Sequence, residues 1–217
     1  MLIEIFADLT CPWCYIGKRR LARALAERPR LRPEVRWQPF QLNPEMPPGG
    51  MDRTVHLATK FGGLERALQL YLMAEETAAR DGVPLTLNRI QRVPNTFDAH
   101  RLIRIAGRRG LDVAMADALF HAYFVQGEDI GDHDTLAATA QTLGFDFHEI
   151  KQLLDSGAEA ASVQAADTLA RQIGLQAVPC YVFNRRYALS GAQDPGSFLP
   201  LLDLAVEEQE GATRVAD

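Results

Sequence analysis

The sequence predicts an α/β fold in which a large all-helical insertion interrupts a single β-sheet. Residues 1–42 show a strand–helix–strand pattern, residues 52–174 are almost wholly helical in pattern, and strand patterns return after residue 180. The two outer segments can complete one sheet only if the helical block is inserted between them. We therefore expect a sheet domain that is built from both ends of the chain.

The N-terminal segment predicts a βαβ unit. LIEIFAD (2–8) is short and apolar, as expected of a strand, and over residues 12–27 the apolar positions recur at helical spacing. The basic residues 18–20 of this helix are expected to form a solvated face. VRWQPFQL (35–42) predicts the second strand, which Pro39 ends or bends.

The helical block follows a connection rich in proline and glycine, NPEMPPGG (43–50). Hydrophobic periodicity, with glycines where helices should stop, predicts helices over 52–61, 64–80, 95–108, 112–125, 133–143, 146–155 and 158–173. The expected N-cap residues are Asp52, Asn95, Asp112, Asp132 and Asp146.

The C-terminal segment predicts a hairpin and a last helix. CYVFNRRYALSG (180–191) contains two β-type runs around a turn, and Asp194-Pro195 opens a helix that continues to about residue 209. The expected boundaries are 1–44 and 175–210 for the sheet domain, 45–174 for the helical insertion and 211–217 for a flexible tail.

The composition is that of an ordinary globular protein. Of the 217 residues, 47% are hydrophobic and 24% are charged, so a sizeable core can form. The net charge of −5 and the lack of a basic block argue against nucleic acid and anionic membranes as partners. No apolar run approaches membrane-spanning length, and the start MLIEIFADLT lacks the features of an export signal. We therefore expect a cytoplasmic protein.

Two cysteines stand at the first strand-to-helix junction, in CPWC at residues 11–14. Pro12 suits the first helical position, which makes Cys11 the N-cap, with its sulfur near the free N–H groups of the first turn. Those donors and the helix dipole favour a thiolate, the attacking species in disulfide exchange. Cys14 lies one turn further in, close enough to form a disulfide with Cys11 but more shielded. We expect Cys11 to attack and Cys14 to resolve the mixed disulfide.

A structural disulfide or a metal site accounts less well for the CxxC motif in this chain. Three cysteines are too few for a disulfide scaffold. A zinc or iron–sulfur site needs four ligands, but the sequence has no second CxxC and no pair of histidines at i, i+4, so we predict no metal. A CxxC in a βαβ context instead indicates thioredoxin-like redox chemistry. The preceding Asp8 is either a buried carboxylate that accepts a proton from Cys14 or a solvated turn residue.

A second landmark is Pro179, which on its own could be no more than a strand breaker. Together with other segments it makes the chain resemble the DsbA superfamily, and within it the FrnE-type cytosolic dithiol oxidoreductases. That branch is related to 2-hydroxychromene-2-carboxylate isomerase and to kappa-class glutathione transferase. The segments that carry the resemblance are DLTCPWCYIGK (8–18), PFQLNP (39–44), NTFDAHRL (95–102), LFHAYF (119–124), AVPCYVF (177–183) and LSGAQ (189–193).

The resemblance implies a DsbA-like fold, in which a thioredoxin-like domain is interrupted by a helical one. It implies that Cys11 and Cys14 cycle between dithiol and disulfide, with Pro179 in cis beside them. The residues that it implies for substrate contact and for the interdomain cleft are Pro12, Trp13, Val178, Asn95 and His100. From the local pattern alone, His100 has a packing or capping role.

Two positions differ from relatives. Strongly oxidising members have a histidine before the second cysteine, whereas Trp13 carries no charge, so we expect a more reducing potential of roughly −270 to −180 mV. Cys180 follows the expected cis-proline. It is either a small buried hydrophobic residue or a third thiol that can divert a mixed disulfide.

The leading hypothesis is a thiol–disulfide oxidoreductase, with disulfide isomerase activity left open, that acts on disulfides of proteins or small molecules. Such an enzyme needs a thiol electron donor but no bound cofactor, and glutathione could serve as its co-substrate. The sequence leaves open whether the protein forms a homodimer. A second hypothesis is a glutathione-dependent isomerase or transferase, but such relatives commonly have serine where Cys11 stands. A third is a noncatalytic binding module whose thiols act as a redox switch.

Overall fold

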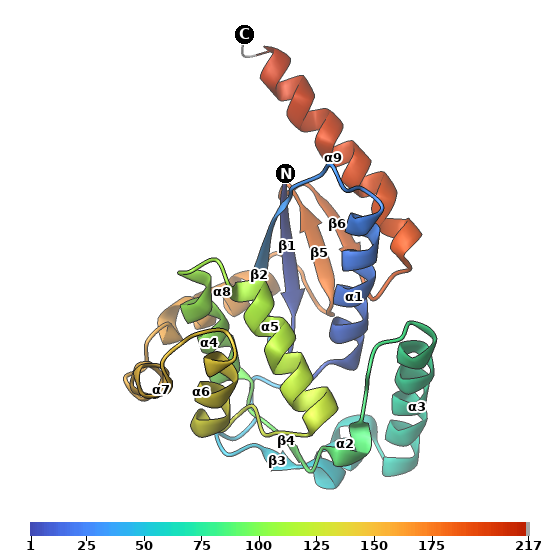
Figure 1. Ribbon diagram of the computed structural model, residues 1–217. Coiled ribbons are helices and arrows are strands. Elements are labelled where there is room, and N and C mark those ends of the chain that lie inside the picture. The colour runs from blue at the N-terminus through green and yellow to red at the C-terminus, as the bar shows by residue number, and fades with distance from the viewer. Residues whose placement is uncertain (216–217) are drawn as a thin grey trace.

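The central sheet is built from both ends of the chain. In the computed structural model, which describes the backbone of residues 1–215 and the side chains of residues 1–207, the sheet has four strands in the order β2-β1-β5-β6 (Figure 1). The first strand, β1 (Leu2–Ala7), pairs in parallel with β2 (Glu34–Pro39) and antiparallel with β5 (Cys180–Phe183). A hairpin joins β5 to β6 (Tyr187–Ser190). The predicted sheet, interrupted by a helical block, is therefore confirmed.

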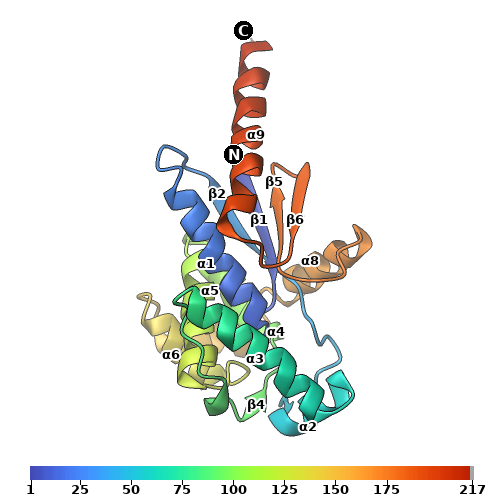
Figure 2. The ribbon, with the colours of Figure 1, turned by 90° about the vertical axis from the view of Figure 1, so that its right-hand side faces the viewer.

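Helices cover both faces of the sheet. On one face, α1 (Pro12–Ala26) packs against α9 (Pro195–Val215), and α8 (Ala160–Gln172) lies on the other side (Figure 2). Ala170 of α8 is buried in a cluster with Phe6 of β1 and with residues of the strand ends. Although the sequence assigns α8 to the insertion, the helix packs against β2 as well as against the helical block.

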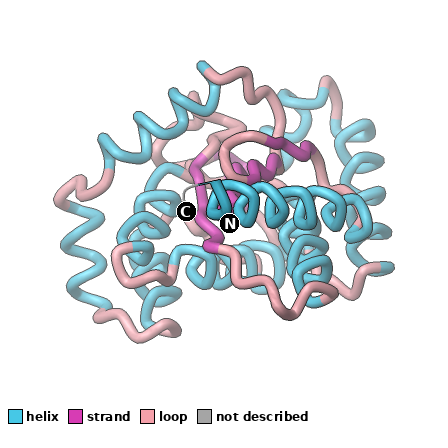
Figure 3. Tube along the Cα trace, turned by 90° about the horizontal axis from the view of Figure 1, so that it is seen from above, coloured by secondary structure: helices cyan, strands magenta, loops and turns pink. Residues whose placement is uncertain are grey.

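The remaining helices lie beyond the end of the sheet at which β1 leads into α1, and in the view from above helices surround the strands (Figures 1 and 3). These elements are α2 (Arg53–Phe61), α3 (Leu64–Arg80), the 3-10 helix η1 (Leu87–Arg89), α4 (Phe97–Gly107), α5 (Asp112–His121), the π-helix η2 (Ala122–Gln126), α6 (His133–Gln141) and α7 (Phe147–Asp155). A two-stranded ribbon of β3 (Met51–Asp52) and β4 (Arg92–Val93), which the sequence pattern did not predict, holds the connections together.

Three of the five predicted N-caps are confirmed, because the carboxylates of Asp52, Asp132 and Asp146 accept hydrogen bonds from the backbone N–H three residues later. The other two predictions were wrong. Thr96 is the N-cap of α4, and Asn95 instead accepts a hydrogen bond from the N–H of Phe97. Asp112 is the first residue of α5, and its carboxylate accepts a hydrogen bond from the N–H of Trp37 in β2, which ties the helical block to the sheet.

The basic residues of α1 do not form the solvated face that the sequence predicts. Lys18 is buried, and its ammonium lies 2.6 Å from the carboxylate of Asp117 in α5. Arg20 bonds to Asp81 at the end of α3. Because α3, α5 and α9 pack around α1, Lys18 and Arg20 pair with acidic residues on or next to these helices instead of reaching water. Arg19 is the exposed member of the three.

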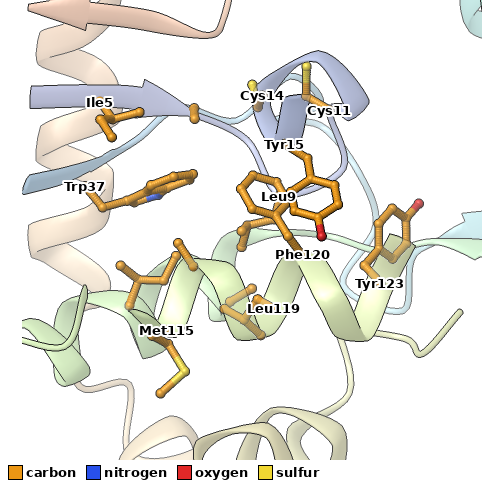
Figure 4. Close-up of a cluster of buried hydrophobic side chains, with 14 of the residues drawn as sticks. Ile5, Leu9, Cys11, Cys14, Tyr15, Trp37, Met115, Leu119, Phe120 and Tyr123 are labelled. Carbon is orange, nitrogen blue, oxygen red and sulfur yellow. The ribbon is translucent and has the colours of Figure 1, made fainter. Parts of the chain in front are cut away.

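Aromatic residues of α1, β2 and α5 are buried together in the core. Tyr15 of α1 stacks on Phe120 of α5 at a ring-centroid distance of 5.1 Å, and Trp37 meets Phe120 edge-on at 5.6 Å (Figure 4). Such pairs add about 0.5–1.5 kcal/mol each to the free energy from buried area. The first turn of α1 therefore lies against a rigid aromatic cluster of the helical block.

The last helix is longer than predicted. It continues to Val215, so residues 211–215, which we expected in a flexible tail, are helical, and residues 216–217 lie outside the described part of the chain. Within the described residues, no helix is both long and apolar enough to cross a membrane.

Candidate active site

The two cysteines of CPWC occupy the first turn of α1. Cys11 is the N-cap residue, with extended backbone angles of φ −93° and ψ 111°, and Pro12 is the first helical residue. The carbonyl oxygen of Cys11 accepts the N–H groups of Cys14 at 3.0 Å and of Tyr15 at 3.3 Å. Cys11 thus occupies the predicted N-cap position at the positive end of the helix dipole, but its sulfur makes no capping hydrogen bond to the N–H groups of the first turn.

Both cysteines are buried, but they differ in access. Cys11 is 5% exposed and lines a pocket, whereas Cys14 is 1% exposed and does not line it. Burial, followed by the neighbouring Cys11, raises the pKa of Cys14 well above its usual value. Both sulfurs are free thiols and point away from the Tyr15–Phe120 stack (Figure 4). The pocket therefore gives access to Cys11 and not to Cys14.

The pocket at Cys11 has a volume of about 300 Å³ and lies between the first turn of α1 and the helical block. It brings together four residues that the sequence assigned to the site: Cys11, Pro12, Trp13 and Val178. The other lining residues are Thr10, Leu42, Asn43, His56, Lys60, Phe61, Leu70, Tyr71, Val93 and Tyr123. A larger hollow of about 790 Å³ between α5 and α6 contains no cysteine.

One wall of this pocket was missed by sequence reasoning. His56 and Lys60 come from α2, Tyr71 from α3 and Tyr123 from η2. In the sequence these residues show only the ordinary periodicity of amphipathic helices, which gives no sign that they face the cysteines. Their role depends on how α2 and α3 pack against α1, and periodicity does not encode that packing.

The segment before β5 forms the opposite wall. The Val178–Pro179 peptide bond is cis, which is the form that the resemblance implied. The Cys11 sulfur lies 3.9 Å from the carbonyl oxygen of Val178. This segment also touches α1 at Gly17, where an added Cβ would lie 3.1 Å from Cγ of Pro179 and would overlap the Tyr181 hydroxyl.

We expect Gly17→Ala to lower the free energy of unfolding by about 1–3 kcal/mol, because the added methyl group overpacks the contact between α1 and β5. The matched control is Gly107→Ala at the end of α4, where a Cβ would meet its nearest neighbour at 3.5 Å. That variant should gain about 0.4–1 kcal/mol by restricting the unfolded chain. Urea unfolding of both variants measures the difference. Equal stability of the two would contradict the close approach at Gly17.

Asp8 lies fully buried beneath the motif, so the solvated alternative is wrong. Its two carboxylate oxygens accept the N–H groups of Leu9 and Leu42, each at 2.7 Å. Burial acts to raise the pKa of Asp8, but His100 and the hydrogen bonds from Leu42 and Thr96 outweigh it, and the pKa is lowered. Asp8 is therefore a buried anion that joins the β1–α1 turn to the chain after β2.

Asn95 and His100 lie outside the cysteine pocket, in contrast to the cleft positions that we expected. His100 is 1% exposed, and its Nε2 lies 3.4 Å from Oδ1 of Asp8, with neither ring nitrogen in a well-formed hydrogen bond. Asn95 donates to the carbonyl oxygen of Met46 and faces a different hollow. His100 thus contacts Asp8 beneath the motif, whereas Asn95 holds the segment around Met46.

Cys180 lies apart from Cys11 and Cys14. It is fully buried with Phe6, Phe40 and Ala170, on the side of the sheet that α8 covers. Burial raises the pKa of its thiol. This placement favours the small buried hydrophobic residue over the third reactive thiol. Among the described residues, no three His, Cys, Asp or Glu side chains gather in a group that could hold a metal ion.

Comparisons with known proteins agree with this geometry. A family model described as a DSBA-like thioredoxin domain matches residues 2–203. A probable DsbA oxidoreductase from Streptomyces coelicolor is 32% identical, with 96% of this chain and 91% of that chain covered and a TM-score of 0.86. The fold alone is shared with a 2-hydroxychromene-2-carboxylate isomerase (16% identical, 100% of each chain, TM-score 0.70). It is also shared with the cytosolic disulfide reductase DsbM from Pseudomonas aeruginosa (21% identical, 99% and 100% covered, TM-score 0.63). The chain therefore belongs to the family of DSBA-like thioredoxin domains.

Proposed function

We propose that the protein is a thiol–disulfide oxidoreductase in which Cys11 is the attacking thiol and Cys14 the resolving thiol. The observation that carries this proposal is the division of access between them. Cys11 caps α1 and lines the pocket, whereas Cys14 lies one turn behind it and outside the pocket. A thiol at a helix N-terminus gains thiolate character, and a second thiol within reach releases what the first one captures.

The reaction in the reducing direction uses both thiols. The Cys11 thiolate attacks one sulfur of a substrate disulfide, so that a Cys11–substrate bond forms and the other substrate sulfur leaves as a thiolate that takes up a proton. Cys14 then loses its proton and attacks the Cys11 sulfur, which forms the Cys11–Cys14 disulfide and releases the second substrate thiol. Two electrons pass to the substrate, and a thiol electron donor returns them to the cysteine pair.

The pocket suits narrow substrates. A cavity of about 300 Å³ around a cysteine that is only 5% exposed admits a small disulfide or an extended peptide strand. Glutathione, whose disulfide is small, is a reasonable co-substrate for a pocket of this size. One solved structure with the same fold, that of DsbM, contains glutathione. We place the protein in the cytoplasm, in the FrnE-type branch, with disulfide isomerisation as a secondary activity when resolution by Cys14 is slow.

Equilibration of the wild-type protein with glutathione redox buffers tests the proposal directly. We expect one disulfide, between Cys11 and Cys14, to form with a midpoint of roughly −270 to −180 mV, and we expect the protein to accelerate insulin reduction by a dithiol. Mass spectrometry after alkylation identifies the linked cysteines. If no disulfide forms and the protein instead isomerises 2-hydroxychromene-2-carboxylate with glutathione, the transferase-type alternative replaces this one.

A further inference from the structure

We propose that Lys60 of α2 stabilises the thiolate of Cys11, and so supplies from the helical block the positive charge that CPWC lacks. This inference rests on the proposed function and concerns which residue favours the charged form of the attacking thiol. In strongly oxidising relatives the charge lies within the motif, but here Trp13 occupies that place. The structure instead brings a cation to Cys11 from a helix about fifty residues along the chain.

The geometry places Lys60 at the pocket. Lys60 and Cys11 line the same pocket, and Lys60 Nζ donates a hydrogen bond of 2.6 Å to Oδ1 of Asn43, which is also a lining residue. Although part of the Lys60 side chain stays exposed to solvent, this bond holds its ammonium group at the pocket wall. Of the described residues that line the pocket, Lys60 is the one with a full positive charge at neutral pH.

A cation is needed here because the motif lies on a buried anion. The ionised carboxylate of Asp8 disfavours a second negative charge close by, and it contributes to the raised pKa of Cys14. Burial lowers the pKa of Lys60, but its attraction to Asp8 and to Cys11 opposes that effect. This attraction is mutual, so the ammonium that Cys11 and Asp8 help to keep charged in turn favours a charged Cys11.

The other titratable groups around Cys11 do not replace this charge. They are Asp8, Cys14, Arg53, His56, Tyr71, Tyr123 and Tyr181. Burial and the nearby Lys60 lower the pKa of His56, which keeps its imidazole neutral at pH 7. The pKa values of the three tyrosines are raised, chiefly by burial, so their hydroxyls stay neutral. The guanidinium of Arg53 lies 5.2 Å from the centre of the Tyr71 ring and outside the pocket lining.

The test compares Lys60→Met with Lys60→Arg and with Lys151→Met. Lys151 is on α7, away from the pocket, where it pairs with Asp134, so its replacement removes one charge from the surface. The first readout is the rate of Cys11 alkylation by uncharged iodoacetamide as a function of pH. The second is the equilibrium of the Cys11–Cys14 pair with 2-mercaptoethanol and its disulfide, an uncharged couple that does not itself bind a lysine.

We expect Lys60→Met to move the midpoint of the alkylation profile to higher pH. It should also shift the redox equilibrium several-fold toward the disulfide, because the reduced form loses stabilisation of its thiolate; a tenfold shift corresponds to about 30 mV. The difference from wild type should shrink in 1 M salt, where the screening length falls from about 10 Å at 0.1 M to about 3 Å. Lys60→Arg and Lys151→Met should both behave like the wild type.

Identical profiles for Lys60→Met and wild type would overturn the inference, and so would an Arg variant that behaves like Met. A shift of the Lys60→Met profile that does not change with salt would indicate a packing effect and would also contradict the inference. Failure of the proposed function is recognised separately. In that case the wild-type pair forms no disulfide in the redox couple, while the iodoacetamide profiles still report on Lys60.

Discussion

Replacing Cys11 with serine should abolish the catalysis of insulin reduction and return the rate to that of the dithiol alone. The serine hydroxyl cannot form a disulfide with the substrate. Cys14 does not line the pocket, so it cannot replace Cys11 as the attacking thiol. Cys14→Ala should keep the first step and lose the second. Mixed disulfides with the substrate should therefore accumulate on Cys11.

Cys180→Ala is the matched control, because it removes a cysteine that is fully buried against α8 on the other side of the sheet. It should retain wild-type turnover and show no cross-link after mild oxidation. Turbidity during insulin reduction and mass spectrometry of the trapped species measure these outcomes. Wild-type turnover in Cys11→Ser would refute the mechanism, and a substrate adduct on Cys180 would revive its role as a third thiol.

The second large effect is expected for Asp8→Asn, which should lower the free energy of unfolding at pH 7 by about 3 kcal/mol. The two carboxylate oxygens accept separate backbone N–H groups, from Leu9 and from Leu42. An asparagine has a single acceptor oxygen, so one buried N–H would face the amide nitrogen and lose its partner. The substitution also removes the charge that faces His100.

This difference should depend on pH with a definite sign. The pKa of Asp8 is lower in the folded state than in the unfolded chain, where it is about 3.9. The contribution of the Asp8 carboxylate to the free energy of unfolding is therefore complete above about pH 4, and it is lost as the pH falls through the lower pKa of the folded state.

The control is Asp194→Asn. Asp194 also forms an ion pair, with Arg20, but its side chain is 81% exposed, so this pair should contribute less than about 1 kcal/mol to stability. Urea unfolding at pH 7 and at pH 3 measures both variants, and a loss at Asp8 that is the same at both pH values would contradict its ionised state.

The order of elements could be predicted from the sequence because it depends on local patterns. Apolar periodicity separated the helical block from the strands, and CPWC at a strand-to-helix junction predicted the capped cysteine, which needs only the first turn of α1. Pro12 favoured this position by its own geometry. These features required no knowledge of distant contacts.

The rest of the site depends on contacts between segments far apart in the chain. Lys60 and Tyr71 reach the pocket only because α2 and α3 fold back toward α1. His100 was expected in the cleft, but it contacts Asp8 beneath the motif and does not line the pocket. Lys18 and Arg20 were wrongly expected in solvent, because helical periodicity does not reveal that α3 and α5 cover that flank of α1.

The pairing of β1 with β5 also has a consequence for how the protein is made. The ribosome adds about 165 residues between Cys14 and Cys180, which takes about 8–30 s at about 5–20 residues per second. During that interval the nascent chain carries Cys11 and Cys14 without the Val178–Pro179 wall. The helical segment, by contrast, is already available to fold around its own aromatic residues. The pocket at Cys11 is thus completed only after the helical segment and the Val178–Pro179 wall have been synthesised.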